Sequence, residues 1–256
     1  MARERRHKPK PKRRRRRFSR LYQMVSTLLV TAALVAACVV FFRVNRVEVE
    51  GNFRYTEEEV IAASRIRVGD NLIALPKGQI ATRILLGLPY VQSVTIDRIL
   101  PDGVLLSVQE HLAAAAVCDG STWWYISSRG KLLEQNSESG PLRITGLTAS
   151  EPVPGEKLQV SAEEAARMSY VLELLEVLEA RGLLSDCSAL DCSSAGRLHL
   201  TYRNFTVKMP TTGDFSYMLH SLEAALEQDG RVGPDDSGTF DFTIAEGKIY
   251  FRRTTE

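Results

Sequence analysis

A run of 22 residues without a charged side chain constrains this chain more than any other feature of its sequence. The run extends from Leu21 to Phe42, and its polar residues are Gln23, Ser26, Thr27 and Thr31. As a helix, at about 1.5 Å per residue, it would measure roughly 33 Å, enough to cross the hydrocarbon core of a bilayer. A surface helix of a soluble protein would carry polar residues along one side throughout, whereas none follows Thr31. The sequence therefore predicts one transmembrane helix over residues 21–42.

The charges are distributed unevenly around this run. Residues 1–20 hold 12 of the 33 Lys and Arg residues and one of the 31 acidic residues, so residues 43–256 carry 21 basic and 30 acidic side chains, a net charge of −9. Basic residues that flank a span favour the cytoplasmic side. We therefore expect a short cytoplasmic tail, a single-pass type II topology in the cytoplasmic membrane and an extracytoplasmic body. The residues expected to fix this topology are Arg13, Arg14, Arg15, Arg16, Arg17 and Arg20.

The arginine run is also typical of nucleic-acid-binding segments. An acidic body would repel a nucleic acid electrostatically. We therefore expect no nucleic acid as a partner, and assign the arginines to topology and to contact with anionic headgroups.

Three alternatives to an uncleaved anchor fit the residues less well. A cleaved signal peptide has a shorter apolar core followed by polar chain, whereas here the apolar run continues through Phe42. The segment Leu34–Cys38 resembles a lipoprotein signal ending in an acylated cysteine, but four bulky apolar residues follow Cys38. The start of a twin-arginine signal also fits Arg15 to Phe18, as it fits any arginine run before a phenylalanine. The uncleaved anchor is the preferred interpretation.

The first part of the body, up to Glu110, has the pattern strand, helix, helix, strand, strand. Apolar and acidic residues alternate in "VEVE" at residues 47–50, and Gly51-Asn52 forms a turn. Thr56 and Glu59 form a capping box at the start of a short helix. A second helix is predicted from about Lys77 to Leu86. A hairpin follows over residues 91–110, with its turn at Pro101-Asp102-Gly103.

The stretches "VEVEGNFRYTEEEVI", "GDNLIAL" and "LPYVQSVTIDRILPDGVLLSVQE" together resemble the POTRA domain of the FtsQ/DivIB bacterial cell-division family. In that family, this domain directly follows a single membrane span with a short basic cytoplasmic tail. The usual ending of the motif, Glu-Arg-x-Pro-x-Ala, is replaced here by Glu110 to Ala115, with His111 at the Arg position and Ala113 at the Pro position.

The rest of the chain also resembles this family. "WWYISSRGKLLEQ" is similar to its tryptophan-rich hairpin, with a turn at Arg129-Gly130. A long helix is predicted to begin with Ser161 as its cap and Glu164 completing the capping box, and to end before Gly182. Strands are expected in "RLHLTYRNFTVKMP", then a helix over residues 215–228. A closing hairpin is expected to turn at Glu246-Gly247.

The residues give no sign of an enzyme, a cofactor site or a metal site. The four histidines are scattered, and the chain contains no G-x-S-x-G, H-E-x-x-H or P-loop motif. The cysteines of the body are Cys118, Cys187 and Cys192. Cys187 and Cys192 are either free structural thiols or a pair that flanks a turn, and their spacing disfavours zinc. We therefore expect a protein that acts by binding other proteins.

From the residues alone, the last strand is first of all an ordinary closing strand of a sheet, although an exposed edge could accept a strand from a partner. The resemblance implies the second role, because in FtsQ/DivIB proteins this edge binds the coiled-coil division proteins FtsB/DivIC, which act with FtsL. Carried over to this chain, the partner-binding residues are Phe240, Asp241, Phe242, Thr243, Lys248, Ile249, Tyr250, Phe251 and Arg252.

The expected fold class is α+β: a cytoplasmic tail at residues 1–20, a transmembrane helix at 21–42, a POTRA domain (β-α-α-β-β) at 43–111 and a mixed α+β domain with an antiparallel sheet at 112–256. The expected function is that of a scaffold at the division septum, linking early and late division proteins and helping to control septal peptidoglycan synthesis. The alternatives are a POTRA-type chaperone or adaptor in protein export, and an exported lipoprotein.

Overall fold

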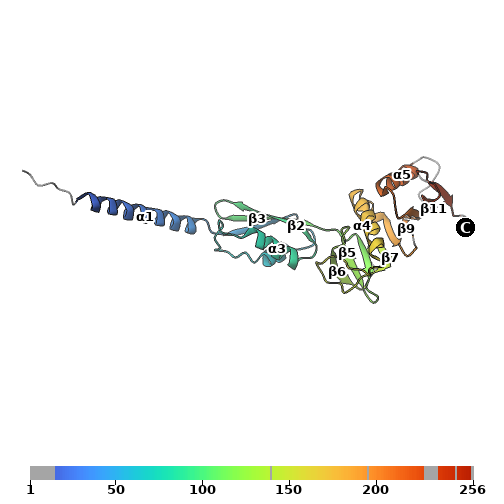
Figure 1. Cartoon of the computed structure of the whole chain (residues 1–256), viewed down its shortest axis with the longest axis horizontal. Coiled ribbons are helices and arrows are strands. Elements are labelled where there is room, and N and C mark those ends of the chain that lie inside the picture. Colours follow the sequence, from blue (N-terminus) through green and yellow to red (C-terminus); the bar gives the residue numbers. More distant parts are fainter. Residues whose placement is uncertain (1–14, 139, 195, 228–235, 246, 255–256) are drawn as a thin grey trace, which may run out of the picture.

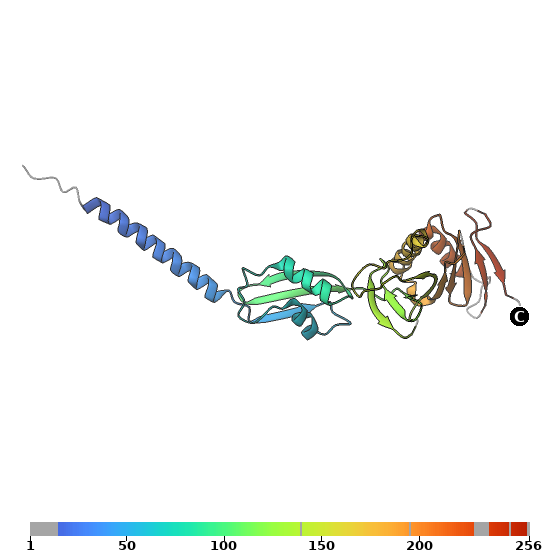
Figure 2. The same ribbon diagram turned by 60° about the horizontal axis from the view of Figure 1, so that its bottom comes forward.

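The computed structural model describes residues 15–138, 140–194, 196–227, 236–245 and 247–254. Its first element is a long helix, α1 (Arg15–Phe41), whose apolar part from Leu21 to Phe41 is long enough to cross a membrane and is not buried against the rest of the protein. Two sheet-containing units follow in a row along the long axis of the molecule, and α1 lies at the end opposite the second unit (Figures 1 and 2).

The first unit has the predicted β-α-α-β-β order. Its elements are β1 (Arg46–Glu50), α2 (Glu57–Ser64), α3 (Lys77–Gly87), β2 (Val91–Ile99) and β3 (Gly103–Glu110). The sheet order is β1-β3-β2, with β1 parallel and β2 antiparallel to β3. The predicted capping box is present, because Thr56 accepts from the backbone N–H of Glu59 while the Glu59 side chain accepts from that of Thr56. Helices and sheet enclose one apolar core that includes Val60, Ile84 and Leu106.

The second unit is built on a nine-stranded sheet with its own apolar core. The sheet order is β12-β11-β10-β9-β8-β7-β4-β5-β6. Its strands are β4 (Ala115–Cys118), β5 (Trp123–Ile126), β6 (Leu132–Asn136), β7 (Arg143–Thr148), β8 (Cys187–Asp191), β9 (Arg197–Tyr202), β10 (Phe205–Pro210), β11 (Gly238–Asp241) and β12 (Tyr250–Arg253). Its helices are α4 (Ala165–Ala180), the single-turn η1 (Leu184–Asp186) and α5 (Phe215–Glu227).

The prediction that this sheet is antiparallel is wrong, because it is mixed. The pairs β4–β7, β7–β8 and β10–β11 are parallel. Helix α4 lies between β7 and β8 in the chain, and α5 lies between β10 and β11. A helix that crosses from the end of one strand to the start of its neighbour makes that neighbour parallel. The α+β class itself is confirmed.

The predicted start of α4 is also wrong, whereas its predicted end is right. The Ser161 hydroxyl donates to the Glu164 carboxylate at 2.8 Å instead of accepting a backbone N–H. Residues 162–164 therefore form a turn, and the helix begins at Ala165. At the other end Gly182 has a φ of 71°, and the N–H of Leu183 reaches back to the carbonyl of Leu178. This is the Schellman arrangement that a glycine permits.

The three cysteines of the body are free thiols. Cys187 begins β8 and Cys192 follows its last residue. Because an extended strand rises about 3.3 Å per residue, the two cysteines lie farther apart than a disulfide can bridge. Both are buried, and burial raises the pKa of the Cys187 thiol to about 12 and that of Cys192 to about 11. The open alternative of a Cys187–Cys192 pair is thereby excluded.

A loop at the far end of the first unit is fixed by one carboxylate. Glu110, the last residue of β3, accepts backbone N–H groups from Phe53, Arg54 and Tyr55 at 3.1, 2.7 and 3.3 Å. A carboxylate that receives several backbone donors holds them firmly because each bond is charge-assisted. The arrangement presents the Arg54 side chain to the second unit.

Arg54 joins the two units at their junction. Its guanidinium lies 4.1 Å from the centre of the Tyr90 ring and 2.6 Å from the Glu134 carboxylate of β6. The Tyr90 hydroxyl donates to the same carboxylate at 2.9 Å. Burial, and then the bond to Glu134, raise the pKa of Tyr90, so the phenol remains a donor. Lys131 adds a bond from its ammonium to the Val91 carbonyl at 2.9 Å.

Replacement of Glu134 by Ala should loosen this junction. We expect a loss of about 1 kcal/mol in the free energy of unfolding, because the pair is partly exposed but also bonded to Tyr90. We also expect a broader distribution of distances between spin labels placed on α3 and α4. The matched control is Glu176→Ala, which removes an exposed ion pair with Arg129 within the second unit. Equal distance distributions in the two variants would contradict the role of Glu134.

His111 should make the stability of this region depend on pH. Burial, and then the positive charge of Lys131, lower the pKa of this imidazole, so the folded protein favours its neutral form. Below the ordinary histidine pKa of about 6.5, the unfolded chain therefore binds more protons than the folded one. We expect the free energy of unfolding to fall as the pH drops through that value, and to fall less steeply in His111→Gln. Identical slopes from chemical denaturation between pH 5 and pH 8 would refute this.

Candidate functional site

The last two strands form one edge of the nine-stranded sheet. Strand β11 pairs in parallel with β10, and β12 pairs antiparallel with β11 in the register Asp241 to Tyr250 and Gly238 to Arg253. Among the described residues no strand pairs with the outer side of β12. All four residues of β12 are exposed. The edge therefore lies open to a partner, near the end of the molecule farthest from α1 (Figure 1).

The core side of β12 is held by stacked aromatic rings. The ring of Phe251 lies 4.6 Å from that of Phe240 and 6.2 Å from that of Phe205. Gly238 makes this packing feasible, because a Cβ there would come within 2.5 Å of the Phe251 ring. Phe240 is buried, whereas Phe251 keeps 36% of its surface exposed. The edge strand is thus anchored on one face and still accessible.

The opposite face of the same strands is polar. Tyr250 and Arg252 lie there with Lys208 of β10 and Asp241 of β11, around a cavity of about 230 Å³. Burial raises the pKa of Asp241, but the two hydrogen bonds from Thr243, together with the charges of Lys208 and Arg197, lower it overall. Those bonds measure 2.8 Å from the backbone N–H and 2.6 Å from the hydroxyl. Asp241 is therefore a fixed anion and not a proton donor.

The backbone of β12 presents free hydrogen-bonding groups to its outer side. The N–H of Thr254 donates to the Ser237 carbonyl at 3.0 Å, which makes these two opposed residues a hydrogen-bonded pair. In an antiparallel ladder such pairs alternate with non-bonded ones. By this alternation Tyr250 and Arg252 bond to β11, while the backbone groups of Phe251 point to the open edge.

The other edge of the sheet is covered at its start. Strand β6 is bordered by residues 155–158, whose backbone bonds with β6 and the preceding turn. Leu132 accepts from the N–H of Gly155 at 2.7 Å and donates to the Glu156 carbonyl at 2.8 Å. Lys131 also forms an isolated bridge with Lys157. Strand β6 is therefore bonded to a neighbouring segment at its first residue, whereas no described segment is bonded to the outer side of β12.

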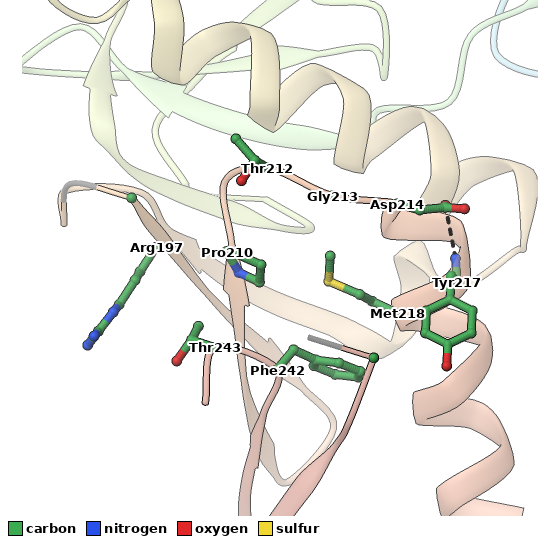
Figure 3. A pocket seen from close by; sticks show the side chains of 11 residues that line it. Arg197, Pro210, Thr212, Gly213, Asp214, Tyr217, Met218, Phe242 and Thr243 are labelled. Atoms are coloured by element: carbon green, nitrogen blue, oxygen red, sulfur yellow. Dashed lines mark hydrogen bonds between the residues drawn. The ribbon is translucent and has the colours of Figure 1, made fainter. Parts of the chain in front are cut away.

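A cavity of about 690 Å³ lies at the end of the sheet beside this edge. Its walls come from the start of β9, the end of β10, the first turn of α5 and the segment after β11 (Figure 3). Pro210, Met218 and Phe242 supply apolar surface, and Arg197 supplies a positive charge. Asp214 also lines the cavity, but its carboxylate accepts from the N–H of Tyr217 at 3.0 Å and so caps α5. The cavity has the features of a binding site.

At both locations the described acidic side chains serve local structure. No cluster of three or more His, Cys, Asp or Glu side chains that could hold a metal ion occurs within the part of the chain that the structure describes. The acids at both places, Asp241 and Asp214, are each engaged in a local turn or cap. What the arrangement offers is an open backbone edge with side-chain cavities on its flanks, which is how sheets recognise an extended peptide.

The structure brings most of the sequence-predicted residues together. Phe240, Asp241, Tyr250, Phe251 and Arg252 lie on the two paired strands, with Ile249 packed partly against the core just before β12. The chain leaves the sheet after Asp241, so Phe242 and Thr243 line the cavity at its end. Glu246, half of the predicted turn, lies outside the described residues, and Gly247 has the positive φ expected of a turn.

Sequence reasoning missed the cavity residues Arg197, Pro210, Tyr217 and Met218. Arg197 and Pro210 are opposed in the β9–β10 hairpin, and Tyr217 and Met218 are added by α5, which crosses between the parallel strands β10 and β11. The only sequence signal for these residues was Tyr217 beside the apolar Met218, close to the start of a predicted helix.

The topology arginines are only partly covered by the structure. Arg13 and Arg14 lie outside the described residues, and Arg15, Arg16, Arg17 and Arg20 belong to the first turns of α1. Their role in orientation stays a prediction.

Comparison with known proteins agrees with this architecture. Residues 42–111 match the family model described as POTRA domain, FtsQ-type. The cell division protein FtsQ of Syntrophotalea carbinolica is 28% identical over 195 residues, which cover 73% of this chain and 66% of that protein. The cell division protein DivIB of Clostridium tetani is 21% identical over 230 residues, 88% of this chain and 86% of that protein. DivIB of Clostridium botulinum (strain Hall) is 24% identical over 212 residues, 82% of this chain and 80% of that protein.

These relatives are named for cell division and not for a catalytic activity. Together with the apolar helix α1, they indicate a membrane-anchored division protein. The POTRA match and the named relatives agree: residues 42–111 match the FtsQ-type POTRA domain, and most of the chain is similar to cell division proteins named FtsQ and DivIB.

Proposed function

We propose that this protein is a non-enzymatic, bitopic scaffold of the bacterial divisome that binds its partner by strand addition to β12. In this proposal residues 1–20 are cytoplasmic, residues 21–42 span the membrane, and the POTRA domain (43–111) and C-terminal domain (112–256) lie outside. The protein acts at the division septum, where it links early and late division proteins and helps to control septal peptidoglycan synthesis.

The open edge of β12 is the observation that carries this proposal. It offers unpaired backbone groups near the end of the protein farthest from α1, whereas the β6 edge is bordered by residues 155–158. Main-chain hydrogen bonds to an added strand give affinity, and pockets for alternate side chains give specificity. Two cavities could receive side chains of the added strand and so give specificity. One is the polar cavity beside Tyr250 and Arg252, and the other is the mixed cavity beside Phe242.

The partner of this edge is a coiled-coil division protein of the FtsB/DivIC type that acts with an FtsL-like protein. The charges at the site fit a segment that carries acidic side chains, because Lys208 and Arg252 line the polar cavity and Arg197 lines the other. Asp241 is the one acid among the described residues that line the polar cavity, and its carboxylate accepts from Thr243.

Variants of Phe251 separate the backbone of the edge from its aromatic packing. Phe251→Pro removes both the ring and the outward N–H, whereas Phe251→Leu removes only the ring. We expect the proline variant to bind the FtsB/DivIC-like partner at least about tenfold more weakly than the leucine variant, since a main-chain bond is lost. Co-purification and titration of the full chain in detergent would measure this, with circular dichroism as the folding check. Equal binding by both variants would eliminate β12 as the strand acceptor.

Arg252→Glu tests the charge of the same edge. Its side chain is exposed and lies on the polar face, so the domain should remain folded while binding weakens by about tenfold and depends less on salt. Arg129→Glu is the control, because it reverses an exposed charge elsewhere in the C-terminal domain. If both reversals weaken binding equally, the effect is one of net charge and not of this site.

Imaging of a fluorescent fusion in dividing cells tests the cellular role. We expect a band at midcell that appears before constriction, because a divisome scaffold must be in place when septal synthesis begins. A uniform membrane signal throughout the cell cycle would contradict the septal role even if β12 binds its partner.

A further inference from the structure

The end of the POTRA domain that adjoins α1 carries three exposed apolar side chains. Val68 is 75% exposed, Ile73 is 52% exposed and Leu100 is 64% exposed; we call these three residues the proximal tips. Between residues 43 and 111 only five large apolar side chains are exposed, the other two being Phe53 and Leu86. Three of the five therefore gather at one end, and exposed apolar groups gathered in this way mark an interaction surface.

Backbone hydrogen bonds tie the tips to the residues that leave α1. Val68 and Ile73 belong to one loop, in which Gly69 donates to the Val44 carbonyl at 2.8 Å and Leu72 donates to the Phe42 carbonyl at 3.0 Å. Val44 in turn donates to the Asp70 carbonyl at 2.9 Å. Phe42 and Val44 are only one and three residues beyond the end of α1. The loop is thus fixed next to the point where the chain emerges from the apolar helix.

Leu100 is tied to the same place from the other side. It lies in the turn between β2 and β3, where Asp102 accepts from the backbone N–H of Asn45 at 2.9 Å. The Asn45 amide also donates to the Asp102 carboxylate at 3.1 Å. Arg98, at the end of β2, donates to the Ile73 carbonyl at 2.8 Å and so connects the two loops. The tips therefore belong to one surface around the start of β1.

The charges of this surface favour anions. Arg43 and Arg67 are exposed, and no ion pair joins either of them to another described residue. The acids beside them are occupied, because Asp70 accepts from the N–H of Arg67 at 2.9 Å and Asp102 is bonded to Asn45. Exposed arginines around apolar tips are the combination that binds the headgroup region of an anionic membrane.

We propose that the proximal tips insert into the headgroup region of the membrane that α1 spans, so that the POTRA domain stands on the bilayer end-on. The occupant is lipid because the surface continues directly from the span and because Arg43 and Arg67 are exposed beside the tips. The first backbone bond to the domain is made by Phe42, the residue directly after α1, which leaves the domain no flexible linker on which to move away. Contact with lipid would then set the direction in which the β12 edge is presented.

The experiment places a polarity-sensitive fluorophore on the full chain in proteoliposomes that contain anionic lipid. The label is attached to Val68→Cys or, as the matched control, to Leu86→Cys, which lies at the far end of α3 and is 76% exposed. Cys38 and Cys118 are replaced by Ala, while the buried Cys187 and Cys192 stay unlabelled at neutral pH because their thiols are poorly ionised. Quenching by lipids with a nitroxide near the headgroup is measured for both positions.

We expect quenching at position 68 to exceed that at position 86 by about threefold or more, since only the tips reach the headgroup region. Quenching at position 68 should fall when the labelled chain also carries Ile73→Ser and Leu100→Ser. It should fall likewise when the labelled chain carries Arg43→Glu and Arg67→Glu. Equal quenching at positions 68 and 86 would overturn the proposal. Emission that shifts with protein density and without lipid quenching would also overturn it, because a second copy would then cover the tips. The β12 edge takes no part in this measurement, so its outcome is independent of partner binding.

Discussion

The carboxylate of Glu110 is the interaction on which the arrangement of the two domains depends. It ends the last POTRA strand and gathers three consecutive backbone N–H groups, and by doing so it fixes the loop that carries Arg54. Arg54 then bridges Tyr90 of one domain and Glu134 of the other. The bridge relies on geometry more than on charge, because a partly exposed ion pair alone stabilises little. Without a fixed loop, Arg54 would have to lose its side-chain freedom each time the domains met.

Local signals in the sequence predicted local structure well. The capping box at Thr56 and Glu59, the glycine stop at Gly182 and the turn at Gly130 each depend on residues within one turn of each other, and each is present. The predicted start of α4 was wrong, although it also rested on neighbouring residues. The Ser161 hydroxyl can either cap a backbone N–H or bond to the Glu164 side chain, and it forms the bond to the side chain. Local chemistry alone does not choose between such alternatives.

Long-range pairing was beyond the reach of the sequence. Periodicity indicated the strands, but it does not say which strand lies beside which, and the parallel pairs made by α4 and α5 were missed. The candidate site shows both cases. Phe240 and Phe251 were identified because a hairpin pairs neighbours in sequence, whereas Arg197, Met218 and Phe242 meet only through the crossover of α5. The added contribution of the structure is therefore the cavity beside the edge and the finding that the opposite edge is covered at its start.

The two ends of the molecule are mechanically connected through this architecture. Phe42, the residue directly after the apolar helix, already bonds to the POTRA domain, and the Arg54 contacts join that domain to the second. A lipid contact at the proximal tips would restrict the tilt of the POTRA domain, and the junction would pass that restriction to β12. An edge strand held in one orientation pays less entropy when a partner strand pairs with it, because fewer relative orientations are lost. In this arrangement the span does more than retain the protein at the membrane: it helps to set the height and the direction at which β12 meets a partner anchored in the same membrane.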